Sequence, residues 1–331
     1  MNVTVSECLE LIDVPIFFVA GGRVSFANSA AQSLLGRHIL GQDFRIAIRH
    51  PASVDLINSG GGGRVAVDSL SDTHSSWQMT CSVLNDGTKL ITLEDLSLRE
   101  RVARAHSDFV ANASHELRTP LAAIIGYVET LADPKAGNDV TTRQRFLGII
   151  RREAQRMQAL VEDLMSLSRI ETGKLEDPHE RVDLVALTHQ VAAEFAGGGT
   201  VTVDSTASTV FTPGDNQQLA QVMRNLIDNG LKYGKPGGPV KVTLEPTQNG
   251  WISISVHDDG DEIAPEHLPR LTERFYRANP SRSREIGGTG LGLSIVKHIV
   301  ERHRGTFNII SKVGRGTTAS LLLRLADPVV S

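Results

Sequence analysis

The sequence predicts a multidomain α+β protein in which a long helical hairpin separates two mixed α/β regions. Between about residues 110 and 167, apolar side chains recur every three or four positions with one polar interruption, the pattern of two amphipathic helices. On either side, short apolar runs alternate with glycine-containing turns, as in strands and brief helices. We therefore predict an N-terminal α/β domain over 1–95, a helical hairpin over 96–172 and a C-terminal α/β sandwich over 180–326.

The bulk composition excludes several classes of protein. Of the 331 residues, 40% are hydrophobic and 22% are charged, and the formal net charge of -4 gives no reason to expect a nucleic-acid partner. No apolar run approaches the ~20 residues that a bilayer requires, so we expect no transmembrane segment. Cys8 and Cys81 lie far apart in the sequence, which favours free thiols in a reducing, cytoplasmic location.

The N-terminal region is expected to adopt an α+β sensor-type fold. The run IFFVAGGRVSFAN predicts a hairpin that turns at Gly21-Gly22, and Asn28 at its end precedes a short helix. Further strands are expected over 77–84 and 89–94, while the glycine run 60–63 is expected to be a loop.

Two apolar stripes define the helical hairpin. The first consists of Val110, Ala113, Leu117, Leu121, Ile124, Val128 and Leu131. The second consists of Phe146, Ile150, Met157, Leu160, Leu164 and Leu167. The run Asp133–Asn138 is expected to end the first helix, and Thr172-Gly173 the second. Two such helices cannot bury both stripes alone, so we expect two chains to pair as a homodimer with a four-helix bundle.

Within the first helix, the segment Ser114–Pro120 places a histidine among polar neighbours. His115 is expected to lie off the apolar stripe, and a neutral imidazole is a good nucleophile near pH 7. Glu116 can orient this ring or accept its proton, and Thr119 lies one helical turn further on, where its hydroxyl can position a water molecule. Because Pro120 lacks an N–H, we also expect a local kink.

The C-terminal region combines helices and strands without a regular βαβ series, which predicts an α/β sandwich. Asp215 is expected to cap a helix that runs to about Tyr233. A second helix is expected over 289–304, opened by a glycine-rich loop. Strands are expected over 241–244, 251–257, 307–311 and 317–324.

One face of the first of these helices carries groups suited to a metal-bound phosphate. Asn225, Asn229, Lys232 and Tyr233 follow one another at intervals that place them on the same side of a helix. Amide oxygens can ligate Mg²⁺, and a lysine can meet phosphates.

Two further segments of the C-terminal region suit the rest of a nucleotide. Asp258 ends a predicted strand, where its carboxylate can accept the adenine amino group, and Gly260 permits the tight turn that follows. The glycine-rich run Gly287–Leu293 leads into a helix, so its backbone N–H groups can cradle phosphates. The polar stretch that ends at Ile286 suits a lid over the nucleotide.

The segment SHELRTPL, residues 114–121, resembles the phosphoacceptor box of the sensor histidine kinases residue for residue. The family's N, G1, F, G2 and last glycine boxes are resembled, in that order, by Asn225–Tyr233, Asp258–Ile263, Leu271–Arg277, Gly287–Leu293 and Gly314–Thr317. The resemblance covers about residues 100–326, two-thirds of the chain.

The resemblance implies an ATP- and Mg²⁺-dependent kinase that phosphorylates its own His115 and passes the phosphoryl group to an aspartate in the receiver domain of a response regulator. By match, Glu116 assists the transfer, Thr119 supports phosphatase action on the regulator, and Asn225 and Asn229 work at the Mg²⁺ end. The residues implied to bind nucleotide are Asn225, Asn229, Lys232, Tyr233, Asp258, Gly260, Gly288, Thr289, Gly290, Leu291, Gly292 and Thr317. In addition, residues 1–95 resemble a PAS sensor domain, and residues 47–52 resemble the PAS region of phosphate-regulon sensor kinases.

Three departures from the family pattern bear on ATP affinity, and one of them, Glu262, motivates an alternative to an active kinase. Glu262 stands where the family usually has glycine, Gly230 where it has alanine, and Thr272 where it has an aromatic residue. A negative side chain near the phosphates suggests a kinase-defective scaffold or phosphatase that still dimerises and binds the regulator. A related ATPase or chaperone with the same nucleotide fold is the other alternative, and the His115 segment argues against it.

Overall fold

The computed structural model of the chain contains two compact units, residues 1–111 and 112–331. The structure describes residues 5–68, 70, 75–133, 135, 138–171, 178–197, 199–247, 249–279 and 288–326. The predicted helix end at Thr172-Gly173, the first glycine of the glycine-rich run and most of the predicted lid lie outside these residues.

The N-terminal unit is built on a five-stranded antiparallel sheet in the order β2-β1-β5-β4-β3. Its strands are β1 Ile16–Ala20, β2 Arg23–Ala27, β3 Gly63–Asp68, β4 Ser76–Val83 and β5 Lys89–Asp95. Its helical segments are α1 Val5–Glu10, α2 Ser29–Leu35, η1 Arg37–Ile39, α3 Phe44–Ala47 and α4 Pro51–Asn58. Apolar side chains from the sheet and from these helices, among them Phe17, Met79 and Leu93, are fully buried together in one core.

The predicted hairpin and helix start in this unit are confirmed, and Asn28 joins them. Its side chain is fully buried and caps α2 by accepting a hydrogen bond from the N–H of Ala31. The same oxygen accepts from the N–H of Ile16 in β1, while the amide group donates to the carbonyls of Leu9, Ile12 and Val14. One buried polar side chain thus links the start of α2 to β1 and to the segment that precedes β1.

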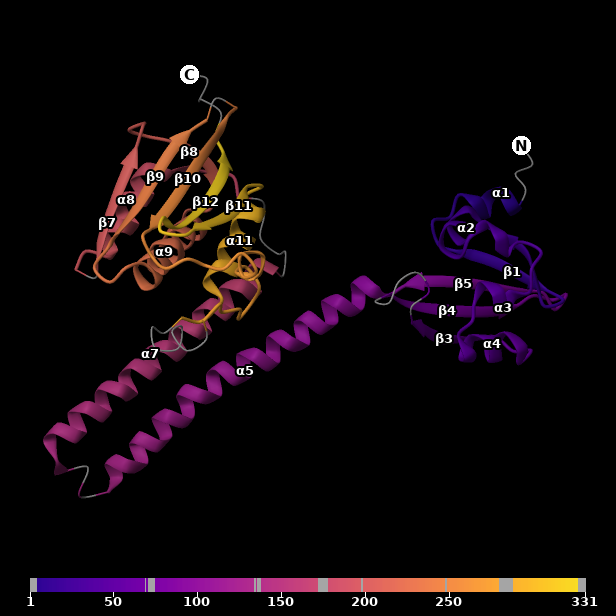
Figure 1. Cartoon of the computed structure of the whole chain (residues 1–331), viewed down its shortest axis with the longest axis horizontal. Coiled ribbons are helices and arrows are strands. Elements are labelled where there is room, and N and C mark those ends of the chain that lie inside the picture. Colours follow the sequence, from indigo (N-terminus) through magenta and orange to yellow (C-terminus); the bar gives the residue numbers. More distant parts are fainter. Residues whose placement is uncertain are drawn as a thin grey trace. The chain divides into compact units, whose positions relative to one another are not determined.

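The predicted helical hairpin is also confirmed (Figure 1). It consists of α5 Ser97–Ala132 and α7 Val140–Glu171, which run antiparallel and side by side, with Tyr127 of one against Phe146 of the other. Pro120 lies inside α5, and the helix continues on both sides of it. No helix among the described residues is both long enough and apolar enough to span a bilayer.

The C-terminal part of the second unit is an α/β sandwich, in which helices cover one face of a five-stranded sheet (Figure 1). The sheet has the order β11-β12-β10-β9-β7, with β7 parallel to β9 and the other pairs antiparallel. A two-stranded sheet pairs β6 with β8. The strands are β6 Glu180–Asp183, β7 Thr200–Ser205, β8 Phe211–Gly214, β9 Pro239–Pro246, β10 Trp251–Asp258, β11 Thr306–Lys312 and β12 Gly316–Arg324. The helices are α8 Leu184–Glu194, α9 Asn216–Tyr233, η2 Leu268–Arg270 and α11 Gly292–Arg302.

The sandwich core forms where the helices meet the sheet. Alternate residues of β10, such as Ile252 and Ile254, are buried, because side chains of a strand point to opposite faces in turn. From the helical side, Leu226 of α9 and Ile295 of α11 are buried as well, with α9 packed on β10 and α11 on β11. This packing fixes α9 and α11 beside each other over one end of the sheet, where the nucleotide segments lie.

Three sequence predictions differ from the structure. The second C-terminal helix begins at Gly292 rather than at residue 289, because Gly290 adopts a left-handed φ of 74° that an α-helix does not allow. Gly63, predicted to lie in a loop, begins strand β3. Strands β6, β7 and β8 and helix α8 had no predicted counterpart.

Candidate nucleotide-binding and phosphoacceptor sites

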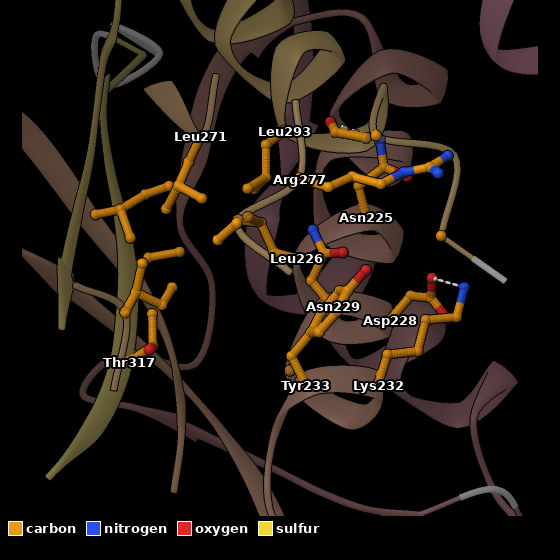
Figure 2. Close-up of a pocket in the computed structure, with 18 of the residues that line it drawn as sticks. Asn225, Leu226, Asp228, Asn229, Lys232, Tyr233, Leu271, Arg277, Leu293 and Thr317 are labelled. Carbon is orange, nitrogen blue, oxygen red and sulfur yellow. Dashed lines mark hydrogen bonds and ion pairs between the residues drawn. The ribbon is translucent and has the colours of Figure 1, made fainter. Parts of the chain in front are cut away.

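Helix α9 presents its predicted polar face to a cavity of about 600 Å³. The helix starts where the Asp215 carboxylate accepts hydrogen bonds from the N–H groups of Gln217 and Gln218, which secures its first turn. Asn225, Asn229, Lys232 and Tyr233 all line the cavity, and Figure 2 shows them along one side of α9 with Leu271 and Thr317 across the space.

Two of these polar side chains have defined partners. Asn225 Nδ2 donates to the carbonyl oxygen of Gly292 at 3.2 Å, which fixes the amide orientation and leaves Oδ1 as its acceptor. Lys232 Nζ lies 2.6 Å from Asp228 Oδ2, one helical turn earlier (Figure 2). The lysine is therefore neutralised by Asp228, a residue that motif reasoning did not select.

Asp258 stands at the end of β10 and faces the cavity. Burial raises the pKa of this carboxyl above its ordinary value, and the hydrogen bond from the N–H of Gly260 at 2.8 Å opposes the rise. A half-buried carboxylate with an unused oxygen is suited to accept a hydrogen bond from an amino group that enters the cavity. Gly230 of α9 lies close by, where an added Cβ would come within 3.0 Å of Val240, so the glycine lets α9 approach the sheet.

The glycine-rich run follows the cavity wall into α11. Gly288, Thr289, Gly290 and Gly292 all line the cavity. An added Cβ at Gly290 would come within 3.0 Å of the backbone of Phe275, so this glycine permits close packing as well as its left-handed φ.

Two predicted nucleotide-binding residues do not line the cavity. Gly260 turns the chain directly after Asp258, and an added Cβ there would come within 2.6 Å of the Asp258 carboxylate. Leu291 is fully buried, and its N–H already donates to the Thr289 hydroxyl at 3.3 Å. Both residues support the wall from behind rather than face the cavity.

The predicted F box contributes to the wall as well, and so does helix α7, which no motif had indicated. Ala159 and Asp163 come from α7, and Tyr276 and Arg277 from the predicted F box. The carboxylate of Asp163 accepts a hydrogen bond from the Thr289 hydroxyl at 2.8 Å. No short motif connects Asp163 with Thr289, because the two residues are 126 positions apart in the sequence.

The predicted phosphoacceptor, His115, is exposed on α5 and lines a second cavity of about 320 Å³. The opposite wall of this cavity comes from the segment 270–276, and Tyr276 lines both cavities. Thr119, one turn further along α5, donates its hydroxyl hydrogen to the carbonyl of His115 at 3.3 Å. The histidine and the nucleotide cavity are thus joined by one short segment of the chain.

Glu116 forms the polar contact between α5 and that segment. Its Oε2 accepts hydrogen bonds from Arg277 at 2.8 Å and from Arg156 of α7 at 3.3 Å. The Arg277 side chain is only 9% exposed, and it also donates to the carbonyl of Thr289 at 3.1 Å. Glu116 is therefore engaged through one oxygen, while Oε1 remains directed to neither arginine.

Two family matches agree with a phosphoacceptor helix that is followed by a nucleotide-binding region. Residues 105–173 match the His Kinase A (phospho-acceptor) domain, and residues 214–327 match the family described as histidine kinase-, DNA gyrase B- and HSP90-like ATPase. A phosphoacceptor helix followed by an ATPase domain of this type defines a histidine kinase.

Whole-chain comparisons agree. The chain is 34% identical over 318 residues to the phosphate regulon sensor protein PhoR of Pseudomonas aeruginosa, an alignment that covers 93% of the chain and 71% of PhoR. It is 32% identical over 244 residues to the sensor protein SrrB of Staphylococcus aureus, covering 72% of the chain and 41% of SrrB. The chain belongs to the sensor histidine kinases of two-component systems, and it is similar to PhoR over nearly all of its length.

Solved structures agree with the fold. The Acinetobacter baumannii histidine kinase AdeS is 25% identical, with a TM-score of 0.52 over 64% of this chain and 98% of AdeS. Histidine kinase ThkA, solved in complex with the response regulator protein TrrA, has a TM-score of 0.56 at 18% identity over 96% of this chain and 98% of ThkA.

Proposed function

We propose that the chain phosphorylates His115 with ATP bound in the cavity between α9 and the glycine-rich run. The observation that carries the proposal is the segment 270–277, which lines both the His115 cavity and the nucleotide cavity and contacts Glu116 beside His115. A nucleophile and its phosphoryl donor must meet at close range, and one connecting segment is suited to bring them together.

The size and donor set of the larger cavity fit a nucleotide. Its volume of about 600 Å³ lies in the range of small-molecule sites. Asp258 is proposed to accept the adenine amino group, and Lys232 with Tyr233 to contact the nucleotide further along α9. Gly288, Gly290 and Gly292 bring backbone close to the phosphates, and Thr317 closes the opposite wall.

Asn225 and Asn229 are the proposed holders of Mg²⁺ at the phosphate end. Because Asn225 donates through Nδ2 to Gly292, its Oδ1 is the atom that a hard cation would take. Magnesium supplies neutralisation of phosphate charge when bound. Asn225 and Asn229 would hold the ion in this cavity, whose wall along α9 also carries the Lys232–Asp228 ion pair.

The proposed reaction is an in-line displacement by His115. A lone pair on an imidazole nitrogen forms the N–P bond to the γ-phosphorus, and the bond from phosphorus to the bridging oxygen breaks, with ADP leaving as the electron pair departs. The proton on the other imidazole nitrogen is proposed to pass to the carboxylate of Glu116, the next residue along α5. Since Arg156 and Arg277 both bond Oε2 of Glu116, its Oε1 is the proposed acceptor that orients and then deprotonates the ring.

The proposed onward step carries the phosphoryl group from His115 to an aspartate of a response-regulator receiver domain. ThkA, which shares this fold, was solved with a response regulator, and this supports the same class of partner for this chain. Thr119 is proposed to place water against the phosphorylated regulator in the reverse, phosphatase activity. Its exposed hydroxyl donates to the His115 carbonyl and keeps its lone pairs for water.

A homodimer is proposed to cover the apolar side chains that a single hairpin leaves exposed. On α5, Val110, Leu121 and Val128 are 51%, 45% and 51% exposed, although all three belong to the predicted core stripe. On α7, Leu147 and Met165 are each 52% exposed. Pairing two hairpins into a four-helix bundle would remove this surface from water.

The N-terminal unit is proposed to be a PAS-like sensor domain, supported by its five-stranded antiparallel sheet, covering helices and single apolar core. Its output would reach the kinase through α5, which begins two residues after β5. We place the reaction in the cytoplasm, where ATP is available.

Glu262 favours one alternative, a kinase-defective scaffold or phosphatase. Its exposed carboxylate lines the nucleotide cavity, so it adds negative charge where a triphosphate would bind. ATP affinity of the wild type beside Glu262→Gly separates the two functions. Tight ATP binding by the wild type would contradict the alternative, and ATP binding by Glu262→Gly alone would support it.

The proposed nucleotide site is tested by Asp258→Asn, with Asp259→Asn as the matched control. Asp259 carries the same charge and follows directly, but it does not line the cavity. Loss of a hydrogen bond to a charged group costs about 1.5 to 3 kcal/mol, or about ten- to a hundredfold in affinity. A calorimetric titration with a non-hydrolysable ATP analogue should show this loss for Asp258→Asn alone, and equal affinities would contradict the assignment.

A further inference from the structure

Helix α7 of the hairpin supplies part of the nucleotide cavity. Ala159 and Asp163 of α7 line it, and the next turn of the helix contacts α9, where Ser166 Oγ donates to Gln221 Oε1 at 2.9 Å. Helix α7 also packs against α11, which follows the glycine-rich run. The hairpin therefore forms part of the proposed nucleotide site as well as carrying the proposed phosphoacceptor.

Asp163 is the charged group that α7 brings to this wall. Its Oδ2 accepts a hydrogen bond from the Thr289 hydroxyl at 2.8 Å, and the same hydroxyl oxygen accepts from the N–H of Leu291 at 3.3 Å. The Thr289 hydroxyl thus has its hydrogen and one lone pair engaged, and the glycine-rich run is held to α7 through it. Thr289 is held a second time through its carbonyl, to which Arg277 donates at 3.1 Å.

The cavity already carries an excess of negative charge around this contact. Among the described residues that line it, the carboxylates are Asp163, Asp228, Asp258, Asp261 and Glu262, and the permanent cations are Lys232 and Arg277. Both cations are engaged by carboxylates, Lys232 by Asp228 and Arg277 by Glu116. A triphosphate brings several further negative charges into this space.

Asp163 lies towards the proposed phosphate end of the cavity. Burial raises the pKa of its carboxyl above the ordinary value, and the Thr289 hydrogen bond and the charge of Lys232 oppose this rise, while Glu162 and Asp228 reinforce it. Its partner Thr289 belongs to the glycine-rich run, whose backbone is proposed to meet the phosphates, so Asp163 lies at the phosphate end of the cavity.

We propose that Asp163 is a positioning residue of the nucleotide site that opposes nucleotide binding. Its carboxylate holds the Thr289 hydroxyl to α7 and sets a negative charge against the incoming phosphates. A bound triphosphate releases this contact, so that nucleotide binding loosens the hold of the hairpin on the glycine-rich run. The inference rests on the proposed nucleotide site, and it adds a residue of the phosphoacceptor hairpin to that site.

The experiment is a calorimetric titration of the full chain with Mg²⁺ and a non-hydrolysable ATP analogue at pH 8. Asp163→Asn removes the charge but keeps an oxygen that can accept from Thr289. Glu162→Gln is the matched control, because Glu162 is the preceding residue and carries the same charge. Its side chain is exposed and accepts a hydrogen bond from Gln158. We expect Asp163→Asn to bind the analogue about tenfold more tightly, and Glu162→Gln to stay within about twofold of the wild type.

A second ligand, AMP, separates the effect of charge from a general change in the structure of the variant. With AMP, which carries fewer negative charges, the gain from Asp163→Asn should shrink to less than about threefold. An unchanged or weaker affinity of Asp163→Asn for the ATP analogue, or an equal gain for both ligands, would overturn the role of Asp163 and leave the nucleotide site standing. No nucleotide binding by the wild type would overturn both the site and this inference.

Discussion

Replacement of Gly316 by alanine should destabilise the ATP-binding domain more than the same replacement of Gly314 in the same turn. Gly316 begins β12 with a left-handed φ of 70°, opposite the end of β10. An added Cβ would overlap the carbonyl oxygen of Asp258 and come within 2.8 Å of the Asp259 Cα. These are backbone atoms of a central strand, so they cannot rotate away as a side chain would.

Gly314 in the same turn separates the two parts of the cost. Its φ is 67°, but an added Cβ would meet no atom within 4 Å. Alanine in the left-handed region costs about 1 to 2 kcal/mol, which is the whole effect expected of Gly314→Ala. Gly316→Ala adds the displacement of packed backbone, a further cost of about 1 to 3 kcal/mol.

The assay is urea unfolding of both variants, read at the transition whose midpoint rises with bound nucleotide and which therefore reports this domain. Gly316→Ala should also weaken nucleotide binding, because the displaced strand end carries Asp258. Equal unfolding free energies for the two variants would refute the close contact, since both share the same backbone strain.

Three further predictions follow from the contacts of the second unit. Burial lowers the pKa of His303, whose neutral ring accepts from the Asp215 N–H, with Arg302 reinforcing and the Asp215 charge opposing the shift. As pH falls, the unfolded chain therefore binds this proton at a higher pH than the folded chain does. The unfolding free energy should fall as pH drops below about 6.5 towards the lowered pKa. Urea midpoints across this pH range measure the fall, and His303→Gln should make them depend less on pH. Asp215→Ala should cost about 1 kcal/mol in thermal unfolding, because it removes the cap of α9, and a loss below about 0.3 kcal/mol would contradict the cap. Arg277→Gln should cost about 1 to 3 kcal/mol in the same assay, against under about 1 kcal/mol for the half-exposed Arg224→Gln, and the reverse order would contradict the buried contact.

The elements predicted well from sequence are those whose signals are local. Helix α9 follows its cap at Asp215 and ends at Tyr233 as predicted, because capping and periodicity act within one segment. The sequence did not predict the elements from β6 to β8. Four-residue strands such as Glu180–Asp183 have too few positions to show an alternating pattern. They are strands because they pair with each other across the chain.

In the candidate site, too, the residues within short motifs were predicted, whereas contacts between residues far apart in the sequence were not. The asparagines of α9, Asp258 and the glycine-rich run were selected by motif, and most of them line one cavity. Asp163 and the contacts of Glu116 with Arg156 and Arg277 were not predicted, because these contacts join residues 126, 40 and 161 positions apart. They come together only through the pairing of α5 with α7 and the packing of this hairpin against the ATP-binding domain.

The central claim is that His115 receives the γ-phosphoryl group of ATP. The most direct measurement is incubation of the full chain with γ-labelled ATP and Mg²⁺, comparing the wild type with His115→Gln and with His189→Gln, an exchange of another exposed histidine, on α8. We predict acid-labile label on the wild type and on His189→Gln, and none on His115→Gln. Label that persists on His115→Gln, or no label on a wild type that binds ATP, would contradict the account.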